Sequence, residues 1–389
     1  MHCSTSNFGG KRQVMSYAPG NVRDAIIGYL AARGGEATTK EIHAALVRNL
    51  GSVASSSVRS YLNLNTPEVF ERTSRGKYRL KLDARRTASS SKFVSIAEAN
   101  ATLYHADCFE WLMDREPASI QAVVTDPPYG LVEYTGREQE KLRSGRGGVW
   151  RVPPSFDGHI RSPLPRFTVL TDKDRRELHA FFCRLGYLLG RVLVPGANVL
   201  VASNPLVGHI VATAMVEAGL EARGTIIRTV MTMRGGDRPK NAHLEFPDVS
   251  VMPRSMWEPW LVFRKQLDGR VQDNLRRWKT GGFRRLSSDR PFGDVIKSNP
   301  TPASERRIVA HPSLKPQAFL RQVVRASLPL GEGVVLDPFA GSGSTLAAAN
   351  AVGYESVGIE SDAEYFALAK TAIGKLASLS IQQINPVGA

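Results

Sequence analysis

The apolar positions near the start of the chain recur with the period of a helix. A first helical run ends at Gly34-Gly35, and Thr38-x-x-Glu41 then has the form of a capping box that opens a second helix. A third, shorter helix follows Ser55. The residues expected to face a common core are Val22, Ile26, Ile27, Leu30, Ala31, Ile42, Ala45, Leu46, Val58, Tyr61 and Leu62.

Residues 69–80 follow a different pattern, because their apolar positions alternate around the turn Ser74-Arg75-Gly76. Such alternation about a glycine-containing turn predicts a β-hairpin. Three helices followed by a hairpin predict a winged helix-turn-helix domain, which we place at residues 20–82.

From Phe93 onward, short apolar runs alternate with helical patterns. This alternation predicts an α/β fold with a doubly wound, mainly parallel sheet. The expected strands are 121–125, 197–202, 224–230, 333–337 and 356–360, and the expected helices are 172–192, 206–218, 344–352 and 362–376.

Segments without periodicity divide the rest of the chain. We expect residues 1–19 and 381–389 to be tails and residues 83–92, rich in Arg, Ser and Lys, to be a linker. The α/β domain then covers residues 93–380. Two basic stretches inside it, near 131–170 and 232–307, read as insertions beside a binding site.

Charge changes this picture by suggesting a partner. The 389 residues contain 51 basic and 36 acidic side chains, which gives a net charge of +15. The excess is marked in residues 1–92, with 15 basic and 6 acidic side chains. A balance this basic favours a polyanion such as nucleic acid, although a ribosomal or membrane-surface protein would also fit.

The three cysteines, Cys3, Cys108 and Cys183, are too few and too scattered to indicate a disulfide framework or a zinc site. We therefore expect a reducing compartment and no metal. No apolar run approaches the roughly 18 residues of a membrane-spanning helix, and the first fifteen residues lack the apolar core of a signal peptide. The expectation is a cytoplasmic protein.

Two short segments carry most of the candidate chemistry. In the first, Thr125–Gly130, an apolar strand runs into Asp126-Pro127-Pro128-Tyr129. Asp126 offers a hydrogen-bond acceptor, the two prolines stiffen the backbone, and Tyr129 offers an aromatic face. Read alone, the segment is also compatible with a tight turn after a strand.

In the second segment, a strand ends at Asp337 and is followed by Pro-Phe-Ala-Gly-Ser-Gly-Ser-Thr345, which opens an Ala-rich helix. Gly341 and Gly343 permit close approach of a nucleotide-like ligand, and the helix N-terminus favours a negative group. Glu360 ends the next strand and is placed to accept ribose hydroxyls. Since both segments end strands, they are expected to converge at one edge of the sheet.

Together these segments resemble the amino-group DNA methyltransferases, which methylate adenine N6 or cytosine N4. Their order in the chain resembles the permuted beta class of that family. The resemblance covers about residues 100–376 and implies a Rossmann-like methyltransferase sheet and S-adenosylmethionine as the cofactor. It does not include the predicted winged helix.

The resemblance also implies roles for individual residues. Asp126 and the Pro127 carbonyl would accept hydrogen bonds from the target amine, with Pro128 fixing the turn and Tyr129 stacking on a base swung out of the duplex. The residues expected at the cofactor are Asp337, Phe339, Gly341, Gly343, Thr345, Glu360, Ser313, Lys315 and Asp107. For Asp107 a helix N-cap is an equally good interpretation.

DNA binding is expected from basic residues in several regions. The third helix of the winged domain would enter the major groove, with the hairpin as the wing. A domain of this shape used for protein–protein contact is the alternative. The residues we expect to bind DNA are Ser56, Arg59, Arg75, Lys77, Arg143, Arg146, Arg276, Arg277, Arg284 and Arg285.

The function expected from the sequence is site-specific methylation of double-stranded DNA, with adenine N6 as the favoured target. Cytosine N4 is the first alternative, because Asp126 is compatible with both bases. An RNA or protein amide methyltransferase and an inactive DNA-binding regulator follow. A cognate restriction endonuclease, a homodimer and association with the bacterial nucleoid complete the expectations.

Overall fold

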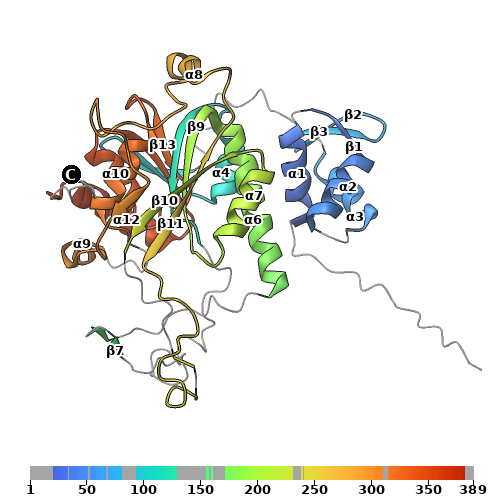
Figure 1. Ribbon diagram of the computed structural model, residues 1–389. Helices are drawn as coiled ribbons and strands as arrows, with labels where there is room; N and C mark the ends of the chain where they lie inside the picture. The colour runs from blue at the N-terminus through green and yellow to red at the C-terminus, as the bar shows by residue number, and fades with distance from the viewer. Residues whose placement is uncertain are drawn as a thin grey trace, which may run out of the picture. The chain divides into compact units, whose positions relative to one another are not determined.

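The computed structural model describes eleven parts of the chain, shown in colour in Figure 1: residues 21–33, 35–50, 53–66, 69–80, 93–128, 155–156, 159–160, 171–230, 238–239, 241–309 and 314–381. The chain divides into two compact units, Met1–Asp83 and Ala84–Ala389. The predicted tails, apart from Ile381, and the predicted linker at residues 83–92 lie outside the described residues. Within the described parts, no helix is both long enough and apolar enough to cross a membrane.

The N-terminal unit contains three helices and a small antiparallel sheet. Its elements are, in chain order, α1 (Asn21–Arg33), β1 (Ala37–Thr38), α2 (Thr39–Leu50), α3 (Ser55–Leu64), β2 (Phe70–Ser74) and β3 (Lys77–Leu80). The strand order is β1-β3-β2, so the predicted hairpin of β2 and β3 is confirmed and β1 adds a short third strand.

Local sequence explains how this unit begins its second helix and closes its hairpin. Thr38 N donates to Glu41 Oε2 (2.7 Å) and Glu41 N donates to Thr38 Oγ1 (3.2 Å), which confirms the capping box. Gly76 has φ +78° in the β2–β3 turn, a conformation that favours glycine. The predicted apolar faces pack together: Ile26, Ile42, Val58, Leu62 and Phe70 are fully buried.

The C-terminal unit is a nine-stranded sheet covered by helices. Its strands are β4 (Val94–Glu98), β5 (Ala101–His105), β6 (Ile120–Thr125), β9 (Leu193–Ala202), β10 (Glu221–Thr229), β11 (Trp257–Arg264), β12 (Val295–Lys297), β13 (Val334–Asp337) and β14 (Glu355–Glu360). Its helices are α4 (Cys108–Asp114), α6 (Asp172–Val192), α7 (Gly208–Glu217), α8 (Val271–Trp278), α9 (Ala303–Ile308), α10 (Gln317–Ser327), α11 (Ser344–Ala351) and α12 (Ala363–Ala377). A separate two-stranded pair is formed by β7 (Ser155–Phe156) and β8 (His159–Ile160).

The order across the large sheet is β12-β10-β11-β9-β6-β13-β14-β5-β4. The five central strands from β9 to β5 run parallel, whereas β11 and β4 are antiparallel to their inner neighbours. This is the predicted doubly wound, mainly parallel, Rossmann-like sheet. The last two strands of the chain, β13 and β14, lie between β6 and β5.

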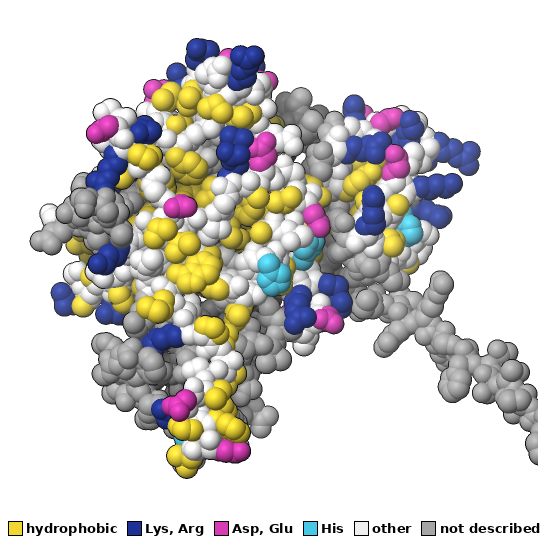
Figure 2. Space-filling model, viewed as in Figure 1, with side chains coloured by type: hydrophobic (Ala, Val, Ile, Leu, Met, Phe, Trp, Pro, Cys, Tyr) yellow, Lys and Arg dark blue, Asp and Glu magenta, His cyan; other side chains and the backbone are white. Residues whose placement is uncertain are grey.

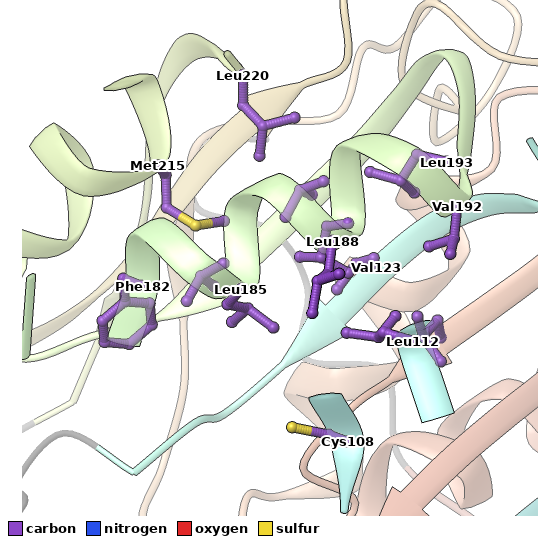
Figure 3. Close-up of a cluster of buried hydrophobic side chains, with 14 of the residues drawn as sticks. Cys108, Leu112, Val123, Phe182, Leu185, Leu188, Val192, Leu193, Met215 and Leu220 are labelled. Carbon is purple, nitrogen blue, oxygen red and sulfur yellow. The ribbon is translucent and has the colours of Figure 1, made fainter. Parts of the chain in front are cut away.

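Alternate residues of the central strands face opposite cores. Val123 of β6 and Leu336 of β13 pack with α4, α6 and α7, and Figure 3 shows Phe182, Leu185 and Met215 in this cluster. Their neighbours Ala122 and Val335 face the other way and pack with α10 and α11. The parallel strands are therefore apolar on both sides, which explains their continuous apolar runs.

The predicted insertion at residues 232–307 is wrong in extent. Its residues Trp257–Arg264 form β11, which lies inside the sheet between β9 and β10, and Trp260 is fully buried. Further along, Phe283 stacks on Phe292 and packs against the core, and Arg264 pairs with Glu221 (2.6 Å). The high density of charge concealed a segment that is largely packed. Most of the predicted insertion at 131–170 lies outside the described residues.

Candidate active site

The two candidate segments lie next to each other because they follow adjacent parallel strands. Leu336 of β13 pairs with Val123 of β6, so the carboxyl ends of both strands meet at one edge. There, Thr125 Oγ1 donates a 2.7 Å hydrogen bond to Asp337 Oδ1, and both residues are buried. This bond ties the strand end next to Asp126 to the first residue of the glycine-containing turn.

The turn from Asp337 to Ser344 is shaped by backbone contacts. Asp337 Oδ1 accepts a hydrogen bond from Phe339 N (3.1 Å), and Ala340 N donates to the Ile359 carbonyl in β14 (2.9 Å). Gly343 has φ +79°, and a Cβ there would lie 2.5 Å from Ile373 Cγ1. Only glycine fits this position, which directly precedes α11.

Asp337 is a buried carboxyl group with several donors around it. Burial raises its pKa to about 6, although hydrogen bonds from Thr125, Thr345 and Phe339 N partly offset that effect. Asp337 and Thr345 thus belong to one network beneath the turn. Phe339 is half-buried and its ring lies 5.8 Å from that of Phe181.

Glu360 at the end of β14 faces the same turn. Its Oε2 accepts a hydrogen bond from Gly341 N (2.7 Å), and its Oε1 accepts one from Asp362 N (2.8 Å). A carboxylate has about four acceptor sites, so Glu360 keeps sites for two further donors. Half-exposed Glu360 and the glycine turn therefore fit a ligand with two vicinal hydroxyls, such as the ribose of S-adenosylmethionine.

On the other side of Asp126 lies a group of charged side chains that the sequence analysis did not assemble. Lys315 Nζ lies 2.7 Å from Asp126 Oδ2 and 3.6 Å from Glu258 Oε2. All three side chains are at most 18% exposed. Lys315 was expected to contact the cofactor; in the structure its ammonium group bridges these two carboxylates.

Further contacts hold Glu258 in place. Its Oε1 accepts a hydrogen bond from Trp260 Nε1 (2.8 Å), and Arg228 NH1 lies 3.3 Å from Oε2. Burial alone would raise the pKa of Glu258, but Lys315 and Arg228 outweigh burial and lower it. Burial would likewise lower the pKa of Lys315, but Asp126 and Glu258 reverse the effect and raise it.

These four groups balance in charge, since two cations face two carboxylates. Buried charges persist only when paired in this way. Glu258 has a local signal in the sequence, because it is a charged residue that interrupts the apolar run Trp257–Phe263. No local pattern indicates Arg228, whose partners Ser298 and Asn299 come seventy residues later in the chain.

Asp107 has the alternative role that its sequence position suggested. It is the N-cap of α4 and its Oδ1 accepts hydrogen bonds from Phe109 N (2.9 Å) and Glu110 N (3.0 Å). Because His105 pairs with Glu360, Asp107 follows β5 at the same edge as the glycine turn. Contact with the cofactor stays a prediction.

The predicted DNA-binding residues are distributed over both units. Ser56 and Arg59 are exposed on α3, and Arg75 is exposed in the β2–β3 turn, whereas Lys77 pairs with Glu36 (2.6 Å). In the C-terminal unit, Arg276 pairs with Asp273 (3.4 Å) and Arg277 with Asp268 (3.0 Å).

Two further arginines contact the protein itself. Arg284 NH1 donates to Tyr354 Oη (2.7 Å), and Arg285 Nε donates to the Ser287 carbonyl (3.4 Å). Arg285 is exposed, but Arg284 is only half-exposed, so its guanidinium group serves the fold at least in part. Four of the predicted site residues lie outside the described residues: Tyr129, Ser313, Arg143 and Arg146.

The chain is similar in sequence to known methyltransferases. Type II methyltransferase M2.LlaDCHI of Lactococcus lactis subsp. cremoris is 26% identical over 283 residues, which cover 72% of this chain and 92% of that protein. DNA adenine methyltransferase YhdJ of Escherichia coli K12 is 29% identical over 153 residues, covering 34% of this chain and 50% of that protein.

Among solved structures, the M1.HpyAVI–SAM complex aligns with a TM-score of 0.40 and 20% identity, covering 69% of this chain and 98% of that one. The family model described as DNA methylase (N6_N4_Mtase) matches residues 120–371, from the start of β6 into α12. This range includes Asp126, Lys315, the glycine turn and Glu360, and it is more than half of the 389 residues. The chain therefore belongs to the N6/N4 family of DNA methylases.

Proposed function

We propose that this DNA methylase transfers a methyl group from S-adenosylmethionine to the exocyclic amine of a base in double-stranded DNA, with adenine N6 as the favoured target. The observation that carries the proposal is the buried Thr125–Asp337 hydrogen bond, which joins the segment of Asp126 to the glycine turn. It holds an amine-binding group and a cofactor-binding turn side by side, as methyl transfer between two bound molecules requires.

The exocyclic amine of a base is a poor nucleophile, because its lone pair is delocalised into the ring. Asp126 would accept a hydrogen bond from one N–H of the amine, and the carbonyl of buried Pro127 would accept one from the other N–H. Neither Pro127 nor Pro128 has an N–H to compete, and their fixed φ keeps both acceptors in place. Tyr129 would stack on the flipped base.

Lys315 and Glu258 act as positioning residues in this proposal. Lys315 holds Asp126 Oδ2, and Glu258, fixed by Trp260 and Arg228, holds Lys315. Because one carboxylate has several acceptor sites, Asp126 can keep this contact and still accept from the target amine. Its orientation is thus set before the base arrives.

When bound, S-adenosylmethionine supplies a methyl group on a sulfonium centre, which is the electrophile that the amine nitrogen attacks. Glu360 would hold its ribose hydroxyls, and the turn at Gly341 and Gly343 would admit it close to the backbone. Phe339 is proposed to line this pocket. Asp107 and Ser313 are proposed contacts on the basis of the family resemblance alone.

Adenine N6 is favoured over cytosine N4 on two grounds. The relative YhdJ is named a DNA adenine methyltransferase, and the segment begins with Asp126 rather than with Ser, the form more typical of the cytosine N4 enzymes. The second ground is modest, because Asp occurs in both groups. Cytosine N4 is therefore the alternative that the first experiment tests.

The N-terminal unit is proposed to be a winged helix that binds DNA. Its order α1-β1-α2-α3-β2-β3 fits that architecture, and Ser56 and Arg59 would begin the helix in the major groove. Figure 2 shows Lys and Arg side chains gathered on the visible face of this unit. Such cations would contact phosphates on either side of the recognised sequence.

Three wider proposals accompany this function. The designation of M2.LlaDCHI as a Type II methyltransferase supports a cognate restriction endonuclease for this chain too. A homodimer would let one protein bind both halves of a symmetric site. The third proposal is association with the bacterial nucleoid in the cytoplasm, where a protein that acts on chromosomal DNA would work.

The first experiment is expression in a host without DNA methylation, followed by digestion of its genomic DNA to nucleosides and mass spectrometry. We expect N6-methyladenine with the wild type and none with Asp126→Ala. Glu355→Ala, which removes an exposed carboxylate at the opposite end of β14 from Glu360, is the matched control and should methylate normally.

The other outcomes separate the alternatives. N4-methylcytosine would change the base and keep the mechanism. A folded protein that binds S-adenosylmethionine but leaves both nucleosides unmodified would rule out DNA as the substrate, and failure to bind the cofactor would indicate a regulator.

A further inference from the structure

Three potential metal ligands that the proposed reaction does not use meet where α6 packs on α7. His179 and Cys183 are four residues apart on α6, so they lie on one face of that helix. Glu217 is the last residue of α7 and faces them. Cys183 is buried, the His179 side chain is 24% exposed and the Glu217 side chain is 51% exposed, so the group opens from the core to the surface.

Their ligand atoms are close enough together to share one ion. His179 Nε2 lies 3.3 Å from Glu217 Oε2 and 3.9 Å from Cys183 Sγ, and all the ligand atoms lie within 4.8 Å of one another. A tetrahedral Zn²⁺ at its usual bond lengths separates nitrogen from oxygen by about 3.3 Å and nitrogen from sulfur by about 3.6 Å. The observed distances of 3.3 Å and 3.9 Å are close to these two values.

We propose that His179, Cys183 and Glu217 bind a Zn²⁺ ion that joins α6 to α7. Imidazole nitrogen, thiolate sulfur and carboxylate oxygen are all ligands that zinc binds, and three protein ligands leave a fourth position for water. The expectation of no metal was based on the scattered cysteines. It overlooked a histidine one helical turn from Cys183 and a carboxylate that only the fold brings near.

The same three residues also make contacts that need no ion, so the alternative to a zinc site is a cluster with a purely structural role. His179 Nε2 can bond Glu217 directly, and Cys183 Sγ donates to the Ala214 carbonyl (3.5 Å). A purely structural cluster of this kind would bind no metal. Zinc binding instead replaces the thiol proton of Cys183 by the metal and releases that proton to solvent.

Co²⁺ is the probe that reports the ligands directly, because a cobalt–thiolate bond gives a charge-transfer absorption band in the near ultraviolet. The starting protein is the full chain carrying Cys3→Ser, so that only Cys108 and Cys183 remain. We expect one Co²⁺ per chain, a charge-transfer band, and loss of that band when one equivalent of Zn²⁺ is added.

Matched variants assign the site. Cys183→Ser should abolish the band, whereas Cys108→Ser, which changes the other buried free cysteine, should leave it intact. Glu217→Gln keeps the size of a largely exposed side chain, so it should fold normally and weaken Co²⁺ binding at least about tenfold.

A second readout needs no spectroscopic metal. Zn²⁺ should raise the Tm of the wild type and of Cys108→Ser but not of Glu217→Gln, since an ion that binds only the folded state stabilises it. Absence of the band, its persistence in Cys183→Ser, or equal affinity in Glu217→Gln would overturn the proposal and leave the three residues as a structural cluster.

Discussion

Single charged groups determine how the active site is prepared for its substrate. Lys315 lies between Asp126 and Glu258, and Arg228 balances the remaining charge. A buried pair of this kind contributes little when compared with apolar packing, but loss of one partner leaves a charge without compensation. The consequences of this arrangement can therefore be measured separately in stability and in activity.

We expect Lys315→Met to lower the free energy of unfolding by about 3 kcal/mol, because two buried carboxylates lose their shared cation. Methylation should fall while the Kd for S-adenosylmethionine stays near that of the wild type. Urea denaturation and cofactor titration measure the two effects, and Lys297→Met, which changes an exposed lysine on β12, is the control.

The double variant Lys315→Met, Glu258→Gln tests whether the contact itself is responsible. Removing both partners should cost less than the sum of the two single changes, by about 1 kcal/mol. Additive costs would contradict coupling between Lys315 and Glu258. A Kd for the cofactor raised as strongly as methylation is lowered would instead support the predicted contact of Lys315 with the cofactor.

Asp337 makes a pH-dependent contribution to stability. Its pKa is about 6 in the folded state and near 3.8 in the unfolded chain. Between these values the folded state holds a proton that the unfolded state has released, so the free energy of unfolding falls as the pH rises. At a pH above the folded-state pKa, Asp337 is ionised in both states and burial of its carboxylate lowers the free energy of unfolding by its full amount.

We expect Asp337→Asn to remove this slope while its amide oxygen still accepts from Thr125. Between about pH 4 and about pH 7, the difference in unfolding free energy between wild type and variant should change by at most about 3 kcal/mol. Urea denaturation of the cofactor-free protein at several pH values measures it. Parallel curves for the two proteins would show that Asp337 does not titrate in this range.

At the scale of elements, the sequence predicted well where each signal was local. The strand of residues 121–125, the helix of residues 172–192 and the β2–β3 hairpin all lie within a residue or two of their predicted positions. The convergence of Asp126 with the glycine turn also followed, because parallel strands present their carboxyl ends at one edge.

The missed features depend on contacts between distant parts of the chain. The bounds of the predicted insertion wrongly included β11, because the place of this strand between β9 and β10 depends on residues far away in the chain. Lys315 contacts both Asp126 and Glu258 although it lies 57 residues after Glu258 in the chain, and no spacing in the sequence indicates these contacts. The helix α8 and the edge strand β12 were likewise too short to stand out.

The turn before α11 provides a test at this scale. Gly343→Ala should reduce stability and cofactor binding, because it adds both an unfavourable positive φ and a contact of 2.5 Å with Ile373. Gly353→Ala is the matched control: its φ is +78°, but a Cβ there meets nothing within 4 Å.

Gly353→Ala should cost about 1 kcal/mol from the backbone alone. Gly343→Ala should cost more, and shortening the neighbour in Gly343→Ala, Ile373→Val should recover part of the difference. Urea denaturation supplies the free energies and calorimetry the cofactor affinity. Equal losses in the two single variants would show that the contact with Ile373 is relieved without cost.

The whole molecule carries a net charge of +15 and divides into two compact units. The C-terminal unit carries the family match and the active site, whereas the N-terminal unit lies outside the matched range. Arg59 and Arg75 of the N-terminal unit are exposed, whereas Lys77 and Arg79 are paired with Glu36 and Glu71.

We expect Arg59→Ala, Arg75→Ala to weaken DNA binding and to reduce the slope of log Kd against log salt by about 2, one for each lost phosphate contact. Methylation at saturating DNA should be unchanged. Fluorescence anisotropy at several salt concentrations measures the slope, with Arg79→Ala as the control. An unaltered slope would favour a protein partner for the N-terminal unit.

The position of β13 and β14 has a consequence for synthesis of the chain. These last two strands separate β6 from β5, which were made more than two hundred residues earlier and end up about 14 Å apart, three strand spacings. A ribosome-bound or prematurely terminated chain would therefore present two unpaired apolar strand edges facing an empty slot. Such edges recruit other strands, so incomplete copies should be captured by chaperones and proteases, and only full-length chains can assemble a site that modifies the genome.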